Sequence, residues 1–162
     1  MIKDKFLWVF IGIFILFLAF IFFRGNDYYE KLSGKEGRAT VANVYKMSGP
    51  DAKGHKYYYY IYKVNDTCYS SSTSGSNVQD LNLHPLQSFL VAYYRPDPTI
   101  HTVIWSYKFD TVVCLGSNFD TLKFDRELIK KHTIGWHELT PKADTTDSTV
   151  ILEYEKKTGK SL

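Results

Sequence analysis

The chain has 162 residues and a net charge of +3, and it contains 13 Tyr, 11 Phe and 3 Trp beside only six Ala. This length suits one compact domain rather than two once an N-terminal segment is set aside. The shortage of Ala disfavours a helical bundle, whereas aromatic and β-branched residues favour strands. The small net charge, with Lys interspersed among Asp and Glu, excludes the concentrated basic surface that nucleic-acid binding needs.

The first feature in chain order is an apolar run from Phe6 to Phe23 without charge or proline. At about 1.5 Å per residue it spans roughly 27 Å, close to the thickness of a hydrocarbon core. A cleavable signal peptide has small residues at its cleavage site, whereas Phe20-Ile21-Phe22-Phe23-Arg24 stands here. We therefore predict an uncleaved transmembrane signal anchor over residues 1–25. Its membrane-spanning residues are Phe6, Leu7, Trp8, Val9, Phe10, Ile11, Ile13, Phe14, Ile15, Leu16, Phe17, Leu18, Phe20, Ile21, Phe22 and Phe23.

Basic residues flank the apolar run on both sides, so the excess of positive charge does not fix its orientation. They are Lys3 and Lys5 before it and Arg24, Lys31, Lys35 and Arg38 after it. A short basic start before an apolar stretch resembles an export signal, which favours a cytoplasmic N-terminus. We expect a single-pass protein of a bacterial inner membrane with its soluble domain in the periplasm.

Residues 26–37 are polar and contain two glycines, which predicts a juxtamembrane linker. A small β domain is predicted over residues 38–106, with strands at 38–47, 57–64, 67–72, 88–94 and 100–105. Asn65-Asp66 predicts a tight turn, and Arg95-Pro-Asp-Pro98 ends the fourth strand. The expected fold is mainly β: an N-terminal transmembrane helix, then a five- to six-stranded antiparallel sheet or partly open barrel.

A C-terminal extension is predicted over residues 107–155. Thr111 to Leu115 suits a sixth strand, and Asp125 to His132 suits a short helix with acidic residues early and basic residues late. Alternating apolar residues over Thr149 to Tyr154 predict a last strand. Residues 156–162 form a polar tail.

Three segments together form a recognisable pattern: Ala39-x-Val41-x-x-Val44, the tyrosine-rich strand Tyr57 to Tyr62, and Val91-x-Tyr-Tyr-Arg-Pro-Asp-Pro98 followed by Ile100 and Val103-Ile104. Over residues 38–105 this pattern resembles a widespread bacterial family of small membrane-associated β domains of unknown function. Members of that family often have a glycine and an acidic residue where this chain has Leu86-Gln87-Ser88. The resemblance implies a compact β domain with strands curled by bulges, and it implies no activity. Val41 and Val44 are three residues apart, so in a regular strand their side chains would point to opposite faces; a bulge in the first strand would place both on one face, and we predict one there.

The tyrosines of the second strand are the candidate protein-binding residues. They are Tyr57, Tyr58, Tyr59, Tyr60 and Tyr62. Successive side chains of a strand point to opposite faces, so one set of these tyrosines fills a core and the other is available as a binding platform. In the alternative interpretation both faces are covered, and the tyrosines pack across strands.

Two cysteines, Cys68 and Cys114, match no zinc-ligand spacing. A disulfide between them is one interpretation if the domain lies outside the cytoplasm, and buried thiols are the other.

No catalytic, cofactor-binding or metal-binding motif is present. The histidines are His55, His84, His101, His132 and His137. Trp136-His137-Glu138 lacks the second histidine of a HExxH zinc motif. The carboxylates Asp110, Asp120 and Asp125 suit turn caps, and the serines of residues 70–76 lack a GxSxG context.

These patterns favour a membrane-tethered, non-catalytic interaction or scaffold protein of the bacterial cell envelope, an accessory subunit that binds another envelope or membrane protein. One alternative is an immunity protein that neutralises a toxin at the membrane. Another is a hydrolase built on His101, His132 or His137 with a nearby Asp.

Overall fold

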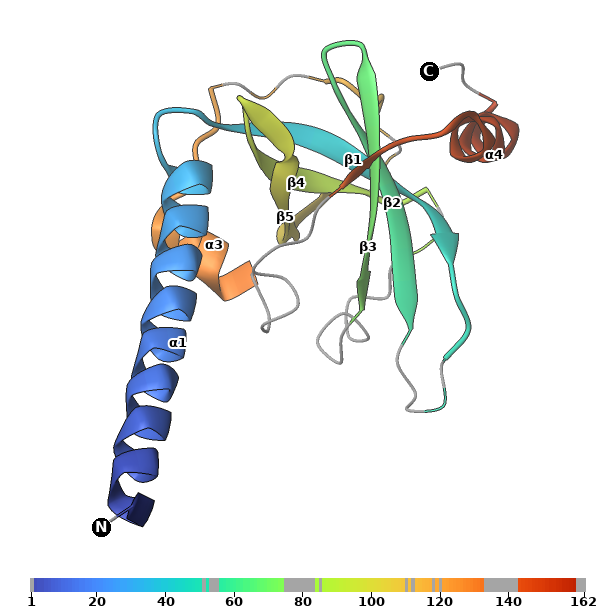
Figure 1. Ribbon diagram of the computed structural model, residues 1–162. Helices are drawn as coiled ribbons and strands as arrows, with labels where there is room; N and C mark the ends of the chain where they lie inside the picture. Colours follow the sequence, from blue (N-terminus) through green and yellow to red (C-terminus); the bar gives the residue numbers. More distant parts are fainter. Residues whose placement is uncertain are drawn as a thin grey trace.

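The computed structural model describes residues 2–50, 52, 56–74, 84, 86–109, 111, 113–117, 119, 121–132 and 143–159, without the side chains of residues 2–7, 74 and 158. The predicted mainly β fold is confirmed. In the described part of the chain an N-terminal helix is followed by a six-stranded antiparallel sheet in the order β5-β4-β1-β2-β3-β6. The sheet is strongly curled, and the helix stands out from it (Figure 1).

The elements and their bounds are α1 (Ile2–Ser33), β1 (Gly37–Met47), β2 (Tyr57–Val64), β3 (Thr67–Ser74), β4 (Ser88–Tyr94), β5 (Asp97–Phe109), α3 (Arg126–His132), β6 (Asp144–Thr145) and α4 (Ser148–Thr158). The five predicted strands correspond to β1 to β5, and the predicted short helix corresponds to α3. Strand β5 starts earlier than predicted, because Pro98 lies near the start of an edge strand, where its missing N–H costs no ladder hydrogen bond. It also ends later than predicted, at Phe109.

The N-terminal helix contains a stretch long and apolar enough to cross a membrane. Its apolar side chains project away from the domain, with Trp8 71% and Phe22 71% exposed. The linker predicted over residues 26–37 is wrong: α1 continues to Ser33, and Tyr28 and Leu32 are buried in the domain. The polar composition hid a helix with one apolar stripe, because Tyr28 and Leu32 are four residues apart and share a face.

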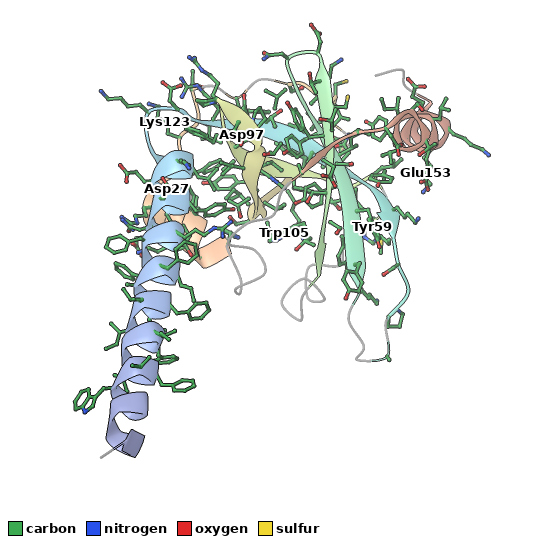
Figure 2. All side chains as sticks on the ribbon, viewed as in Figure 1. Asp27, Tyr59, Asp97, Trp105, Lys123 and Glu153 are labelled. Atoms are coloured by element: carbon green, nitrogen blue, oxygen red, sulfur yellow. The ribbon has the colours of Figure 1, made fainter. Side chains whose placement is uncertain are left out.

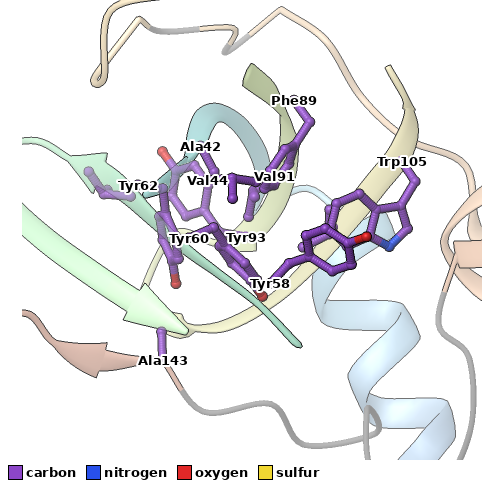
Figure 3. Close-up of a cluster of buried hydrophobic side chains, with 12 residues drawn as sticks. Ala42, Val44, Tyr58, Tyr60, Tyr62, Phe89, Val91, Tyr93, Trp105 and Ala143 are labelled. Atoms are coloured by element: carbon purple, nitrogen blue, oxygen red, sulfur yellow. The ribbon is translucent and has the colours of Figure 1, made fainter. Parts of the chain in front are cut away.

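The inner face of the curled sheet holds the largest hydrophobic cluster (Figure 3). Its buried members are Ala42, Val44, Tyr58, Tyr60, Tyr62, Val64, Phe89, Val91, Tyr93, Val103, Trp105 and Ala143. Within each strand these residues alternate, as the period of two requires. The three tyrosines of β2 therefore point inward.

The outer face is covered at two places. Helices α1 and α3 pack over β1, β4 and β5 through residues that include Leu32, Ala39 and Ile129. Helix α4 packs at the other end through Tyr154, which lies against Tyr45 and Ile61. Because β1 and β4 are covered on both faces, their residues are almost continuously buried rather than alternately buried and exposed.

The first strand does contain a bulge, but not between Val41 and Val44. Those two residues lie in the outer and inner clusters respectively, in ordinary alternation, because both faces of β1 are buried. The pairing of β1 with β2 shifts register between Val44 and Lys46 instead.

Among the described residues, two turns contain a residue with positive φ other than glycine. Asn65 has φ 54° in the tight turn between β2 and β3, as predicted for Asn65-Asp66, since asparagine tolerates this region. Leu86, where the resembled family often has glycine nearby, has φ 70° and its N–H donates to the carbonyl of Val44 at 2.7 Å.

Three predictions about the C-terminal extension are corrected. The described residues between Thr111 and Leu115 form no strand, because they cross over the outer face where Asn43 and Ser88 bind Val113. The strand predicted over residues 149–154 is helix α4, which includes the start of the predicted polar tail. Asp147 caps α4 by accepting from the N–H groups of residues 149 and 150, and Gly159 ends it with φ 65°.

Candidate functional site

Hydroxyl groups of the inner tyrosines connect β2 to β5 across the curl of the sheet. The Tyr60 hydroxyl lies 2.8 Å from Nε2 of His101, and the Tyr62 hydroxyl donates to the carbonyl of Pro98 at 2.7 Å. From α1, the Tyr28 hydroxyl donates to the carbonyl of His101 at 2.6 Å. Each bond joins elements distant in sequence, so the tyrosines hold the curled sheet and the helix together.

His101 is fully buried at the centre of this network. Its Nδ1 lies 3.0 Å from the carbonyl of Thr99, which can only accept, so Nδ1 carries the ring proton and Nε2 accepts from Tyr60. Burial lowers the pKa of His101 to about 4. The imidazole is therefore neutral near pH 7, and both of its nitrogens already take part in hydrogen bonds within the domain.

The two edges of the curled sheet approach one another without pairing along their length. The N–H of Ala143, just before β6, donates to the carbonyl of Thr99 on β5 at 3.2 Å. Further along this seam lies a pit of about 20 Å³, enough for about one water molecule. It is lined by Tyr60, Ser72, Thr73, Thr102, Val103, Trp105 and His132.

A serine and a histidine meet at the rim of this pit. The hydroxyl of Ser106, exposed at the end of β5, lies 3.0 Å from Nε2 of His132, the last residue of α3. Burial lowers the pKa of His132, and Lys131 lowers it further, so the neutral ring prevails near pH 7. This pair has the geometry of a nucleophile and base, and the described residues supply no carboxylate in contact with it. Of the other predicted histidines, His55 and His137 lie outside the described residues.

On the outer face, a polar group is buried between the two helix-covered clusters. Asn43 is fully buried, and its Nδ2 donates to the carbonyl of Val113 at 3.1 Å and to the Tyr154 hydroxyl at 2.9 Å. Its Oδ1 accepts from Ser88 at 2.7 Å, and Ser88 accepts from the N–H of Val113 at 2.8 Å. These bonds fix α4 and the segment around Val113 to the sheet.

The predicted tyrosine platform is mostly interior. Tyr58, Tyr60 and Tyr62 are buried in the inner cluster and cannot reach a partner, whereas Tyr57 and Tyr59 on the opposite side are half-buried. The sequence predicts that successive tyrosines of β2 point to opposite faces of the sheet. Which of the two faces becomes the interior depends on the direction in which the sheet curls.

Tyr59 borders a shallow polar groove of about 230 Å³ on the outer face. The groove is lined by Tyr45, Tyr59, Ser70, Ser71, Ser72 and Asp144. Lys46 lies over the Tyr59 ring, 5.5 Å from its centroid. We call this surface the Tyr59 groove. Three serines of the run that lacks a GxSxG context, Ser70, Ser71 and Ser72, therefore form part of the wall of a surface groove on β3.

The two cysteines are thiols and form no disulfide. Cys68 is half-buried against the cluster of Tyr45, Ile61 and Tyr154, and burial raises the pKa of its thiol. Cys114 is exposed in the segment after β5. Of the two interpretations of these cysteines, the structure therefore has the free thiols and not the disulfide, and only the thiol of Cys68 packs in a cluster.

Among the described residues, no group of three or more His, Cys, Asp and Glu side chains is arranged to hold a metal ion. Asp125 caps α3 by accepting from the N–H of Leu128 at 2.7 Å, as expected of a turn carboxylate. Asp110 and Asp120 lie outside the described residues.

The fold and these sites define a small curled β domain with a tyrosine-bonded interior, carried on a helix long enough to span a membrane. The chain matches no family model, no curated protein and no solved structure. The family resemblance given by the sequence pattern therefore stays a prediction.

Proposed function

We propose that this protein is a single-pass membrane protein whose β domain is a non-catalytic docking module, an accessory subunit of a complex in the bacterial cell envelope. The observation that carries the proposal is the unbroken helix α1. Its N-terminal part presents apolar side chains outward, with Phe23 69% exposed, while Leu32 near its C-terminal end is 2% exposed in the domain core.

This arrangement favours an anchor over a cleaved signal sequence. A soluble domain exposing so long an apolar stripe would aggregate, so the stripe requires lipid or another apolar partner. The junction between the stripe and the domain is helical, with Gly25 already buried, whereas a cleavage site needs small residues before it. The domain is then held at a fixed position beside the membrane, which suits a subunit that docks onto a neighbouring protein.

The Tyr59 groove is the surface on which we place the partner, an envelope or membrane protein. It is what remains accessible of the predicted tyrosine platform. It combines a half-buried aromatic ring with serine hydroxyls and one carboxylate, a composition that suits a polar protein interface. Outside α1, the exposed large apolar side chains of the described residues are only Tyr107 and Leu152.

The anchor is tested by the mass of the protein recovered from membranes after an alkaline wash. We expect the full chain to stay in the membrane fraction, and we expect its mass to include residues 1–25. A chain beginning after Phe23, released by the wash, would contradict the anchor and support a signal sequence.

The docking function is tested by a photo-crosslinking amino acid placed at Ser72 in the groove, with Leu152 on the exposed side of α4 as the matched control. Both positions are exposed in the domain. We expect a discrete adduct with another membrane or envelope protein from position 72 and none from position 152. A protein that stays monomeric after gentle solubilisation, without an adduct from either position, argues against docking.

A hydrolase is the second candidate, because Ser106 and His132 are within hydrogen-bond distance. The test is labelling of the purified full chain by a fluorophosphonate, which reacts with an activated serine. Labelling that disappears in Ser106→Ala and in His132→Gln would support an enzyme. Labelling at the same background level in all three proteins supports the docking module.

A further inference from the structure

The continuity of α1 fixes how far the β domain lies from the membrane. Tyr28 follows Phe23 by five residues, which is about 7 Å of helix. A headgroup layer is about 5–7 Å thick, since the full bilayer exceeds its hydrocarbon core by about 10–15 Å. Tyr28 binds the carbonyl of His101, so the part of β5 around His101 lies about one headgroup layer from the hydrocarbon. One side of the domain must therefore face the membrane surface.

Helix α3 lies on this side. Arg126 at its start contacts Asn26 of α1, only three residues beyond Phe23. From there α3 crosses behind α1, and its C-terminal end lies beyond α1 and lower in the view than its start, on the side of the domain from which the N-terminal half of α1 extends (Figure 1). Lys130 and Lys131, both exposed, lie at that end. Their ammonium groups thus lie near the level of the headgroups.

The end of the sheet where β1 finishes and β2 starts lies on the same side. In Figure 1 this end reaches further toward the N-terminus of α1 than the point where α1 leaves the domain. If α1 stood perpendicular to the membrane, this end of the sheet would lie nearer the hydrocarbon than the point where α1 leaves the domain, and the exposed Lys56, directly before β2, would be brought toward a region where a charged side chain is costly. A tilt of α1 that lifts the sheet avoids this cost, and membrane helices tilt by about 20° on average.

We infer that the face formed by the C-terminal end of α3 and by the β1–β2 end of the sheet rests on anionic phospholipid headgroups of the leaflet from which α1 emerges, with α1 tilted. The inference rests on the proposed membrane anchor and adds to it a second contact with lipid. We call this surface the lipid face. Its two described contact points are Lys130 and Lys131 on α3 and Lys56 at the start of β2.

The charges around the lipid face are compatible with an anionic surface. Glu127 lies 2.8 Å from Lys130, and Asp125 is occupied in capping α3. On α1, Asp27 lies 2.6 Å from Lys31. The acidic groups are therefore partly compensated, while Lys131 and Lys56 add about 1 kcal/mol each near a negative membrane surface.

The geometry is tested with the full chain in nanodiscs, in a Cys68→Ser, Cys114→Ser background that carries one spin label. Labels at Lys131 and Lys56 probe the lipid face, and labels at Lys123 and Lys156 are matched controls. Figure 2 places Lys123 beyond the C-terminal end of α1, and Lys156 lies on α4. Nickel chelated to lipid headgroups should shorten the relaxation times of the first pair several-fold and leave the controls near background.

A label at Lys56 that behaves like the one at Lys123 overturns the two-point contact, even if the label at Lys131 responds. The anionic preference is tested by comparing discs of phosphatidylcholine with discs that also contain phosphatidylglycerol. We expect the response at Lys56 to be at least twofold larger with phosphatidylglycerol, and expect this gain to be lost in Lys130→Glu, Lys131→Glu. The pair Lys123→Glu, Lys156→Glu should retain it, and equal responses in both lipids overturn the anionic occupant.

Failure of the anchor is distinguishable from failure of the lipid face. Only protein that floats with lipid after an alkaline wash enters the measurement. A chain that does not float refutes the membrane anchor, whereas a chain that floats without a response at Lys56 refutes only the lipid face.

Discussion

His101 shows why this interior uses tyrosine where phenylalanine would give similar packing. The Tyr60 ring packs edge-on against Phe89, with centroids 5.5 Å apart, while its hydroxyl reaches His101 on another strand. The Tyr62 ring stacks on Tyr69 and contacts His101. Aromatic rings supply buried area, and the hydroxyl groups supply specific partners that fix how far the sheet curls.

The first prediction concerns the pH dependence that His101 gives to stability. Its pKa is about 4 in the folded protein against 6.5 when unfolded, so the unfolded chain takes up the proton first as the pH falls. The contribution of His101 is fully present above pH 6.5 and decreases by about 3 kcal/mol as the pH falls to about 4. His101→Gln, which keeps an acceptor for Tyr60, should remove this slope.

The measurement is the free energy of unfolding of the full chain in detergent micelles at several pH values. We expect the stability advantage of the native protein over His101→Gln to shrink steadily between pH 6.5 and pH 4. His132 titrates in the same direction in both proteins and cancels in the difference. A difference independent of pH would mean that His101 is not neutral and buried as described.

The second prediction concerns Asn43, whose side chain serves three partners at once. Asn43→Ala leaves Ser88, the Tyr154 hydroxyl and the carbonyl of Val113 without their amide partner in a buried site. We expect a loss of about 3 kcal/mol, because three buried hydrogen bonds are lost and each contributes about 1 kcal/mol. Thr40→Val is the control, since Thr40 makes one bond, to the carbonyl of Lys63 at 3.0 Å, and should lose about 1 kcal/mol. Chemical unfolding measures both, and equal losses would contradict the network.

At the scale of elements, the junction between α1 and β1 is a tight turn rather than a flexible linker. The N–H of Gly34 donates to the carbonyl of Glu30, and the N–H of Gly37 donates to the carbonyl of Gly34. A Cβ atom at Gly37 would lie 2.0 Å from the carbonyl oxygen of Leu32. The backbone of the helix end thus passes so close to the first strand that only glycine fits.

The third prediction follows from that contact. Gly37→Ala forces the end of α1 away from β1 and should destabilise the protein by about 3 kcal/mol or more, because the clash is with backbone. Gly49→Ala is the matched control: no atom lies within 4 Å of its added Cβ, so we expect a change below about 0.5 kcal/mol. Thermal unfolding of the two variants checks this, and similar midpoints would show that the junction yields easily.

Local sequence signals predict those elements in which the hydrophobic period of the segment and the turn residues at its ends indicate the same secondary structure. Asn65-Asp66, the prolines after Tyr94 and the charge order of α3 each mark an element end, so β1 to β5 and α3 follow from them. Helix α4 was mistaken for a strand because Val150, Leu152 and Tyr154 alternate. The same residues place Val150 and Tyr154 four apart on one helical face, and Asp147 and Gly159 are the cap signals that decide for the helix.

The sites were less predictable than the elements, because their members meet only through the fold. Ser106 and His132 are 26 residues apart, and Asn43 and Tyr154 are 111 apart. Nothing in the local pattern of either pair indicates the contact. The tyrosine strand has the opposite difficulty: its alternation is evident, but the choice between interior and surface depends on the curl of the whole sheet.

At the scale of the whole molecule, the apolar helix α1 and the domain form one continuous body. Because α1 enters the core without a linker, the tilt of the helix determines the orientation of the domain. The same tilt therefore determines the directions in which the lipid face and the Tyr59 groove point. If α1 is the proposed anchor, the Tyr59 groove is held at a constant height above the bilayer, where we expect it to meet the proposed partner. The side of the membrane on which this happens depends on the direction of α1.

The final prediction concerns that direction and uses the unequal exposure of the two thiols. Cys114 is exposed, whereas Cys68 is half-buried and its pKa is raised, so a maleimide reacts faster at Cys114. With a cytoplasmic N-terminus, a membrane-impermeant maleimide should label the protein in cells whose outer membrane alone is permeabilised. Labelling should persist in Cys68→Ser and disappear in Cys114→Ser. If labelling instead requires lysis of the inner membrane, the domain faces the cytoplasm: the anchor stands, its orientation is reversed, and the partner must be sought on the cytoplasmic side.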